Sequence, residues 1–162
     1  MKIIDRLNQD RIHISFEVFP PKTDEGFDKV ASATDEMAKL GPAFISVTYG
    51  AGGGTSKNTA KIASHIKDDL KVLSLAHLTC ASSTKEEVRG VIKNLKKLGI
   101  ENILALRGDI PPDVSFPAKD RFRYAYELVE EIRKHGDFCM GAACYPEGHV
   151  ENEHKEDDIR YL

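Results

Sequence analysis

The sequence has no apolar stretch long enough to cross a membrane, few cysteines and little excess charge. The segment Met1–Leu7 also lacks the apolar core and cleavage site of a signal peptide. A formal net charge of −3 gives no electrostatic reason to expect nucleic acid or an anionic membrane as a partner. The three cysteines (Cys80, Cys139 and Cys144) are an odd number without tight metal-ligand spacing. They fit a reducing compartment better than a disulfide framework, so we expect a cytoplasmic protein that binds neither membrane nor nucleic acid.

What the sequence does contain is a set of short apolar runs, each of which ends in polar residues. The five runs are Ile12–Glu17, Phe44–Thr48, Val72–His77, Ile103–Asp109 and Cys139–Tyr145. The stretches between the runs have helical periodicity, which predicts parallel strands joined by helices. Polar residues end every run, and no G-x-G-x-x-G motif follows the first one. Both features favour a barrel over an open doubly wound sheet.

The predicted fold class is therefore α/β, of the (β/α)8 TIM-barrel type, represented by about the first five strands and four helices. A complete barrel typically takes about 250 residues. We therefore expect residues 1–162 to form a single partial TIM-barrel catalytic domain that stops before the barrel closes. The expected strands are Ile12–Phe19, one after Gly41-Pro42, Val72–Leu78, Asn102–Leu106 and one after Gly136. The expected helices are Met1–Gln9, Asp24–Leu40, Lys57–Lys67, Lys85–Leu98, Arg121–Lys134 and one entered through Glu151–Asp158.

Glu17 is a carboxylate within the first apolar strand. The alternation of Ile12, Ile14, Phe16 and Val18 places it on the opposite face from those side chains. Because both faces of a parallel barrel strand are largely buried, we expect the Glu17 carboxyl to be partly desolvated. That environment suits a general acid, although an outward-turned, solvated carboxylate is the alternative.

Two further strand ends carry candidate ligand-binding residues. In Arg107-Gly108-Asp109, the arginine offers donors for phosphate or carbonyl groups, the glycine permits close backbone approach, and the aspartate can bind a ring N–H. An Arg–Asp pair that only orders the loop explains the tripeptide equally well. Thr48-Tyr49-Gly50-Ala51 and the glycines that follow could wrap a cofactor with backbone donors, but they do not match a P-loop.

The histidines near the strand ends give weaker signals. His77 ends the third run and His149 follows the fifth, and a lone histidine is more often structural than catalytic. Neither His77 with Cys80 nor Cys144 with His149 supplies three convergent ligands, so no metal site is expected. The ring of Tyr145 could stack on a planar ligand or pack at the barrel rim.

Taken together, the strand ends resemble a known family. The segments that carry the resemblance are Ser15–Lys22, Ser46–Ala51, Ala76–Cys80, Leu104–Pro112 and Ala142–His149, in this order. They closely resemble the bacterial methylenetetrahydrofolate reductases. The resemblance implies an FAD-containing (β/α)8 barrel that reduces 5,10-methylenetetrahydrofolate to 5-methyltetrahydrofolate with NAD(P)H, in one-carbon and methionine metabolism. It covers essentially the whole chain but not the family's remaining strands.

The resemblance also implies roles for individual residues. Glu17 matches the general acid that assists opening of the methylene bridge, and Asp109 matches the carboxylate that binds the pterin and influences the flavin. The other positions implied to line the FAD are Thr48, Tyr49, Ala51, His77, Arg107, Gly108, Tyr124, Ala125, Tyr145, His149 and Asp158. Folate and a nicotinamide nucleotide are the implied partners, and a homo-oligomer is expected.

Two other interpretations remain open. The chain could be a non-catalytic half-barrel that binds a ligand or assembles as a dimer. It could also be an unrelated barrel enzyme, such as an aldolase or a phosphate-binding isomerase. An aldolase of the Schiff-base type needs a lysine at a strand end, and none of the five runs ends in one.

Overall fold

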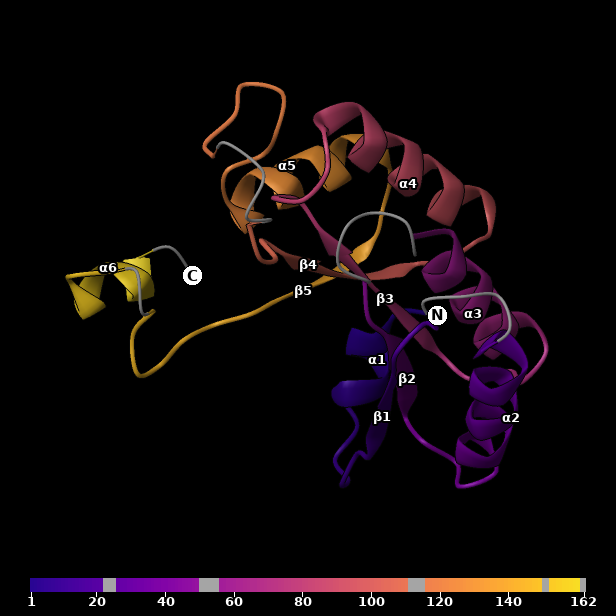
Figure 1. Cartoon of the computed structure of the whole chain (residues 1–162). Helices are drawn as coiled ribbons and strands as arrows, with labels where there is room; N and C mark the ends of the chain where they lie inside the picture. The colour runs from indigo at the N-terminus through magenta and orange to yellow at the C-terminus, as the bar shows by residue number, and fades with distance from the viewer. Residues whose placement is uncertain (22–25, 50–55, 111–115, 150–151, 161–162) are drawn as a thin grey trace.

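The computed structural model describes residues 1–21, 26–49, 56–110, 116–149 and 152–160 (Figure 1). The helices are α1 (Ile3–Leu7), α2 (Phe27–Ala38), α3 (Ser56–Asp68), α4 (Lys85–Lys97), α5 (Ala125–His135) and α6 (Lys155–Arg160). The strands are β1 (Ser15–Val18), β2 (Phe44–Val47), β3 (Ser74–Thr79), β4 (Asn102–Leu106) and β5 (Cys139–Ala142). No helix in these ranges has the length and apolar character needed to cross a bilayer.

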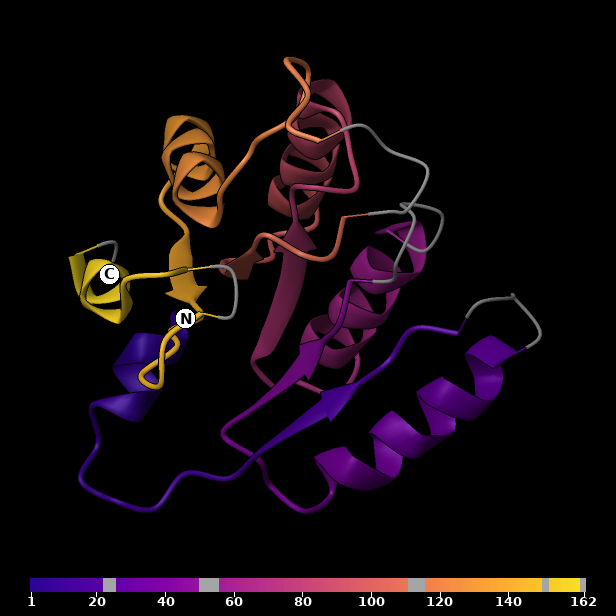
Figure 2. The ribbon, with the colours of Figure 1, turned by 60° about the vertical axis from the view of Figure 1, so that its left-hand side comes forward.

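The strands form one parallel sheet in the order β1-β2-β3-β4-β5. Each new strand joins the sheet beside the preceding one, as in a barrel, and the order never reverses as it does in a doubly wound sheet. Helices α2 to α5 follow one side of the curving sheet (Figure 2). The predicted α/β fold, a partial barrel of the (β/α)8 type, is confirmed.

Several predicted elements begin later than expected, and β1 and α5 differ the most instructively. β1 starts at Ser15, opposite Phe44, and the segment before Phe44 contains Pro42, which cannot donate to a ladder. The Ile14 carbonyl oxygen still accepts a hydrogen bond from the Ala43 N–H at 2.7 Å, but Ile12 and Ile14 lie outside the strand, 92% and 62% exposed. The helix predicted from Arg121 starts at Ala125, because the backbone N–H groups of the two preceding residues donate to the Glu127 carboxylate.

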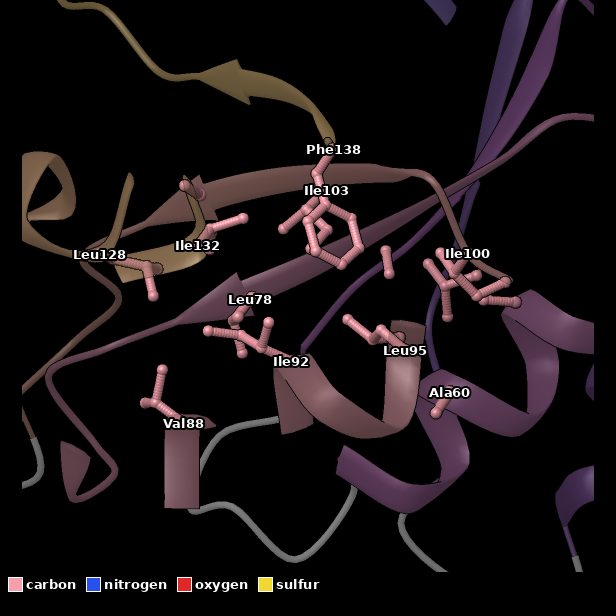
Figure 3. Close-up of a cluster of buried hydrophobic side chains, with 14 of the residues drawn as sticks. Ala60, Leu78, Val88, Ile92, Leu95, Ile100, Ile103, Leu128, Ile132 and Phe138 are labelled. Carbon is pink, nitrogen blue, oxygen red and sulfur yellow. The ribbon is translucent and has the colours of Figure 1, made fainter. Parts of the chain in front are cut away.

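The two faces of the sheet differ in burial. Six outward-pointing residues, two each from β2, β3 and β4, are fully buried beneath the helices: Ile45, Val47, Ala76, Leu78, Ile103 and Ala105. Part of this core, including side chains from α4 and α5, is shown in Figure 3. The opposite, concave face carries Glu17, Ser46, Leu75, His77 and Leu104, as the strand register requires.

Helix α4 shows how local sequence sets the position of a strand-connecting helix. Thr84 is its N-cap, and the Thr84 hydroxyl and Glu87 carboxylate form a capping box. Gly99 follows the helix with φ +66°, the conformation expected of a glycine at a helix end. Three side chains on one face of the helix (Val88, Ile92 and Leu95) are buried in the core.

The amino-terminal helix α1 is tied to segments far along the chain. The Ile3 N–H donates to the buried Asn102 side-chain oxygen at 2.8 Å, and the Asn102 amide donates to the Ser74 carbonyl oxygen. The Lys2 ammonium lies 2.5 Å from an oxygen of Asp137. Because Asn102 and Ser74 begin their strands, α1 lies at the amino-terminal end of the sheet, opposite the strand ends that carry the candidate site.

His65 on α3 bonds two carboxylates on the helical side of the molecule. Its Nδ1 lies 2.7 Å from Asp69 and its Nε2 2.8 Å from Asp35 on α2. Both ring nitrogens can donate only when the imidazole is protonated. Burial tends to lower the pKa of His65, but the hydrogen bonds to Asp69 and Asp35 outweigh burial and hold that pKa above its usual value.

Protonated His65 is therefore expected to join α2 to α3 in a pH-dependent way. Because the folded-state pKa is raised, this stabilisation is fully present below the unfolded-state pKa and is lost as pH rises through the folded-state pKa. His65→Gln should lower the free energy of unfolding by about 0.5–1 kcal/mol at about pH 6, and by less at about pH 9. Urea unfolding at the two pH values measures this, with His154→Gln as an exposed control. A difference that does not change with pH would contradict the prediction.

Candidate active site at the carboxyl ends of the strands

Three polar side chains from adjacent strands meet on the concave face of the sheet. Glu17 of β1 pairs in register with Ser46 of β2, and Ser46 pairs with Leu75 of β3. Because side chains alternate along a strand, His77 shares the face of Leu75, two residues nearer the carboxyl end. The structure therefore brings the predicted acid and the predicted His77 together, and it adds Ser46.

The two polar contacts that described residues make with the Glu17 carboxylate fall on the same oxygen. The Ser46 hydroxyl donates to Oε2 at 3.3 Å, and His77 Nε2 lies 3.4 Å from Oε2. The prediction that Glu17 points to the other face of β1 from Phe16 and Val18 is confirmed. The predicted desolvation is wrong for this chain, because the Glu17 side chain is 47% exposed. The physical reason is that β1 lies at one edge of the sheet, with β2 as its single neighbour among the described strands.

His77 is buried, unlike Glu17. Its residue exposure is 7%, and Nε2 is a buried polar atom without a hydrogen-bond partner among the described residues. Burial lowers the pKa of His77, and the nearby Glu17 charge opposes that effect only in part. His77 is therefore neutral at physiological pH, and Nε2 can form a hydrogen bond with a bound molecule.

The β4 end is shaped by a close contact with β3. Gly108 has φ +75°, and a Cβ added there would lie 2.8 Å from the Thr79 Cβ. The Arg107 carbonyl oxygen accepts hydrogen bonds from the Cys80 and Ala81 N–H groups at 3.2 and 2.9 Å. Arg107 is partly buried and Asp109 is exposed. The sequence predicts that Gly108 permits close approach of the backbone. In the structure, the backbone at Gly108 closely approaches Thr79 at the end of β3.

The β2 end is described only in part. The Thr48 N–H donates to the Val18 carbonyl oxygen at 3.0 Å, and the Thr48 carbonyl oxygen accepts from the Thr59 hydroxyl at 2.9 Å. These bonds fix the backbone at Thr48, and Tyr49 packs against the hydrophobic core. Ala51 and the neighbouring glycines lie outside the described residues.

Tyr124 and Ala125 stand at the start of α5. The Tyr124 ring is exposed, lies 5.9 Å from the Tyr126 ring in a stacked arrangement, and has the Arg123 guanidinium 4.9 Å from its centre. Because α5 follows β4 in the chain and packs against it, its first residues lie on the carboxyl-end side of the sheet.

The remaining predicted residues form a local cluster after β5. The Tyr145 and His149 rings meet edge to face, with their centres 4.8 Å apart. The backbone N–H of His149 donates to an oxygen of Asp158 at 2.7 Å. A hydrogen bond from the Asn152 side chain, together with that from His149, lowers the pKa of Asp158. Figure 1 shows α6, which carries Asp158, at the end of a connection that leads away from the sheet. The structure does not bring this cluster together with Glu17 and His77.

No group of three or more His, Cys, Asp or Glu side chains that could hold a metal ion occurs among the described residues. Cys80, which the sequence places near His77, is buried, and burial raises the pKa of its thiol to about 12. Its Sγ lies 3.7 Å from the Arg107 carbonyl oxygen. The thiol is therefore protonated at neutral pH, whereas a metal ligand or nucleophile must be a thiolate.

A hollow of about 620 Å³ lies elsewhere, among α2, α3 and α4. Its lining includes Phe27, Lys61, His65 and Leu98, and none of the residues that the sequence predicts for the site. Carboxyl ends of parallel barrel strands are where active sites form, so the Glu17–His77 region is the stronger candidate.

Two residues that shape this region, Ser46 and Thr79, are not among those predicted from the sequence. A signal was available for Ser46, since it is a polar residue inside an apolar strand and lies in phase with Thr48 at the strand end. Thr79 carries no such signal, because its importance comes from its contact with Gly108 on the neighbouring strand.

Comparison with known proteins gives a consistent result over the whole chain. The family model described as methylenetetrahydrofolate reductase matches residues 2–162. 5,10-Methylenetetrahydrofolate reductase of Escherichia coli (strain K12) is 38% identical over 154 residues, which cover 95% of this chain and 51% of the relative. Methylenetetrahydrofolate reductase 1 of Schizosaccharomyces pombe is 38% identical over 170 residues, covering 100% of this chain and 28% of the relative. Methylenetetrahydrofolate reductase (NADH) 1 of Zea mays is 40% identical over 91% of this chain and 26% of the relative. The chain thus spans about half the length of the bacterial relative and about a quarter of the other two.

Proposed function

Because the chain belongs to the methylenetetrahydrofolate reductase family, we propose that it takes part in the flavin-dependent reduction of 5,10-methylenetetrahydrofolate to 5-methyltetrahydrofolate by NAD(P)H. The observation that carries the proposal is the placement of Glu17 beside buried His77 on the concave face of the sheet. A carboxyl group exposed on this face can reach a bound substrate and can act as its proton donor.

The residues at the strand ends fit a flavin. Buried His77 Nε2 has no hydrogen-bond partner among the described residues and is available to the polar edge of a ring system. Gly108 presents backbone without a side chain at the end of β4. Between these two positions, the partly exposed Leu104 and Leu106 give the concave face an apolar surface. A planar ring with polar edges matches this combination of surfaces.

The bound flavin would supply the hydride chemistry, first accepting from the nicotinamide and then donating to the folate. The part assigned to this chain is proton transfer. The Glu17 O–H bond breaks and its proton passes to the folate nitrogen, while the carboxylate keeps the electron pair. The carbon–nitrogen bond of the methylene bridge then opens, and its electrons remain on that nitrogen. The carbon is left as an iminium ion that can accept hydride.

The other residue roles follow from the family. We assign pterin binding to Asp109, which is exposed after β4. The positions assigned to FAD are Thr48, Tyr49, Ala51, His77, Arg107, Gly108, Asp109, Tyr124, Ala125, Tyr145, His149 and Asp158. For residues 145–158 this assignment requires that the local cluster approach the strand ends when the cofactor binds.

The remaining parts of the proposal concern the protein as a whole. Residues 1–162 would be part of one catalytic domain of a cytoplasmic homo-oligomer that uses NADH or NADPH. The name of the maize relative specifies NADH, which favours NADH here.

Titration with FAD tests the proposal directly. We expect saturable binding with a perturbed visible spectrum and quenched flavin fluorescence. His77→Gln should weaken the affinity several-fold, because it removes the buried Nε2, whereas His13→Gln, outside the site, should not. Absence of binding by a chain that circular dichroism shows to be folded would contradict the proposal and favour a non-catalytic half-barrel that acts through assembly.

A further inference from the structure

The carboxylate of Glu17 is held asymmetrically. Ser46 Oγ at 3.3 Å and His77 Nε2 at 3.4 Å both approach Oε2, and neither approaches Oε1. We propose that Ser46 is a positioning residue that fixes Oε2 of Glu17 and so leaves Oε1 as the oxygen that donates the proton. This inference rests on the proposed function of Glu17 as the acid, and it adds a residue and an atom to that function.

The environment of Ser46 supports a fixed hydroxyl. Ser46 is 6% exposed, so bulk water has little access to its side chain. The hydroxyl has a single proton to donate, and its two acceptors are Glu17 Oε2 at 3.3 Å and the Phe16 carbonyl oxygen at 3.5 Å. Phe16 and Glu17 are neighbours on β1, so either bond holds Ser46 against that strand. The shorter bond directs the hydroxyl to the carboxylate.

His77, on β3, makes the second contact with Oε2 and is not a charged proton donor. Burial lowers the pKa of His77, which keeps the ring neutral at physiological pH. A neutral imidazole beside Oε2 limits the rotation of the carboxyl group, and the exposed side of Glu17 faces the concave surface. Oε1 is therefore the oxygen that points toward a bound substrate.

The hydrogen bond from Ser46 strengthens as the reaction proceeds. When the Oε1–H bond breaks, the proton passes to the folate nitrogen and the electron pair stays on the carboxyl group, which becomes negative. A hydroxyl donor to Oε2 stabilises that developing charge more than it stabilises the neutral acid. Ser46 thus favours proton donation as well as setting its direction.

Three variants separate positioning from packing. Ser46→Ala removes the hydroxyl, Ser46→Thr keeps it, and Ser74→Ala removes a buried serine from the opposite face of β3. In stopped-flow measurements on the flavin-loaded enzyme, Ser46→Ala should slow folate reduction about tenfold. Flavin reduction by NAD(P)H should stay within about twofold of wild type. Ser46→Thr should restore most of the rate, and Ser74→Ala should leave it unchanged.

A second readout does not require activity. The protonation midpoint of His77, followed by NMR of its ring carbon, depends on the Glu17 charge beside it. Glu17→Gln should lower this midpoint, and Ser46→Ala should lower it part of the way, because the carboxylate is no longer held against the ring. Ser46→Thr should return the midpoint toward wild type, and Ser74→Ala should not move it.

The two readouts distinguish failure of the inference from failure of the proposed function. If the enzyme reduces folate but Ser46→Ala changes neither the rate nor the His77 midpoint, the inference is wrong. It is also wrong if Ser74→Ala reproduces the losses, since they would then reflect packing. If the wild-type protein reduces no folate, the proposed function fails, and the His77 midpoint alone decides whether Ser46 holds the carboxylate.

Discussion

Glu17→Gln should slow folate reduction at least a hundredfold, to roughly the level expected without a general acid, while leaving flavin reduction by NAD(P)H nearly intact. Glutamine has almost the same shape as glutamate and can still accept the Ser46 hydrogen bond, but its amide cannot donate a proton to the folate nitrogen. Hydride transfer from the nicotinamide needs no such proton. The two half-reactions should therefore respond differently to the same substitution.

Anaerobic stopped-flow absorbance measures both half-reactions on one preparation. Flavin bleaching on addition of NAD(P)H reports the first, and flavin reoxidation by methylenetetrahydrofolate reports the second. Glu36→Gln is a suitable control, since Glu36 is an exposed carboxylate on α2. An equal loss in both half-reactions of Glu17→Gln would remove Glu17 from the role of acid.

Gly108→Ala should destabilise the protein by about 2–4 kcal/mol and weaken flavin binding with it. Two separate costs add at this position. The φ of +75° is unfavourable for any residue with a Cβ, and the new Cβ would lie 2.8 Å from the Thr79 Cβ. Relief of the overlap would move the end of β4 away from β3, which would displace Arg107 and Asp109 from the strand-end surface.

The two costs can be measured separately. Gly41 has φ +65° and nothing within 4 Å of an added Cβ, so Gly41→Ala reports the backbone cost alone, about 1–2 kcal/mol. Thr79→Ala in the Gly108→Ala background removes the methyl and hydroxyl contacts but keeps the Cβ contact, and it should recover only part of the loss. Urea unfolding gives the free energies. Equal losses in Gly41→Ala and Gly108→Ala would show that the contact with Thr79 carries no cost.

The fold was largely predictable because its signals are local. The structure confirms the predicted β4 bounds, and the Thr84 capping box and the glycine after α4 likewise depend on a few neighbouring residues. The parallel order follows from the helices between the strands. The start of β1 was not predictable from its own sequence, because Ile12 and Ile14 continue the apolar alternation, whereas the strand pairing begins only at Ser15 with Phe44.

The candidate site was predictable in its residue types and less so in its geometry. Alternation along β1 correctly placed Glu17 on the other face of the strand from Phe16. Its exposure was misjudged, because burial depends on which elements flank β1 rather than on the strand itself. The contact of Gly108 with Thr79 and that of Ser46 with Glu17 join different strands, so register decides them. Register is a property of the assembled sheet and cannot be read from one segment.

The attachment of α1 has a consequence for the order of folding during synthesis. Its partners Asn102 and Asp137 lie 99 and 135 positions beyond Ile3 and Lys2. Helix α1 therefore leaves the ribosome well before the groups that bind it, which emerge only when β4 and the residues just before β5 have been made. Closing so long a loop costs entropy that only the finished sheet can offset. Until then α1 lacks its long-range hydrogen bonds and exposes Ile3, which is buried in the folded chain. A segment made before its partners should therefore be among the last to dock, and a chaperone would have long access to it.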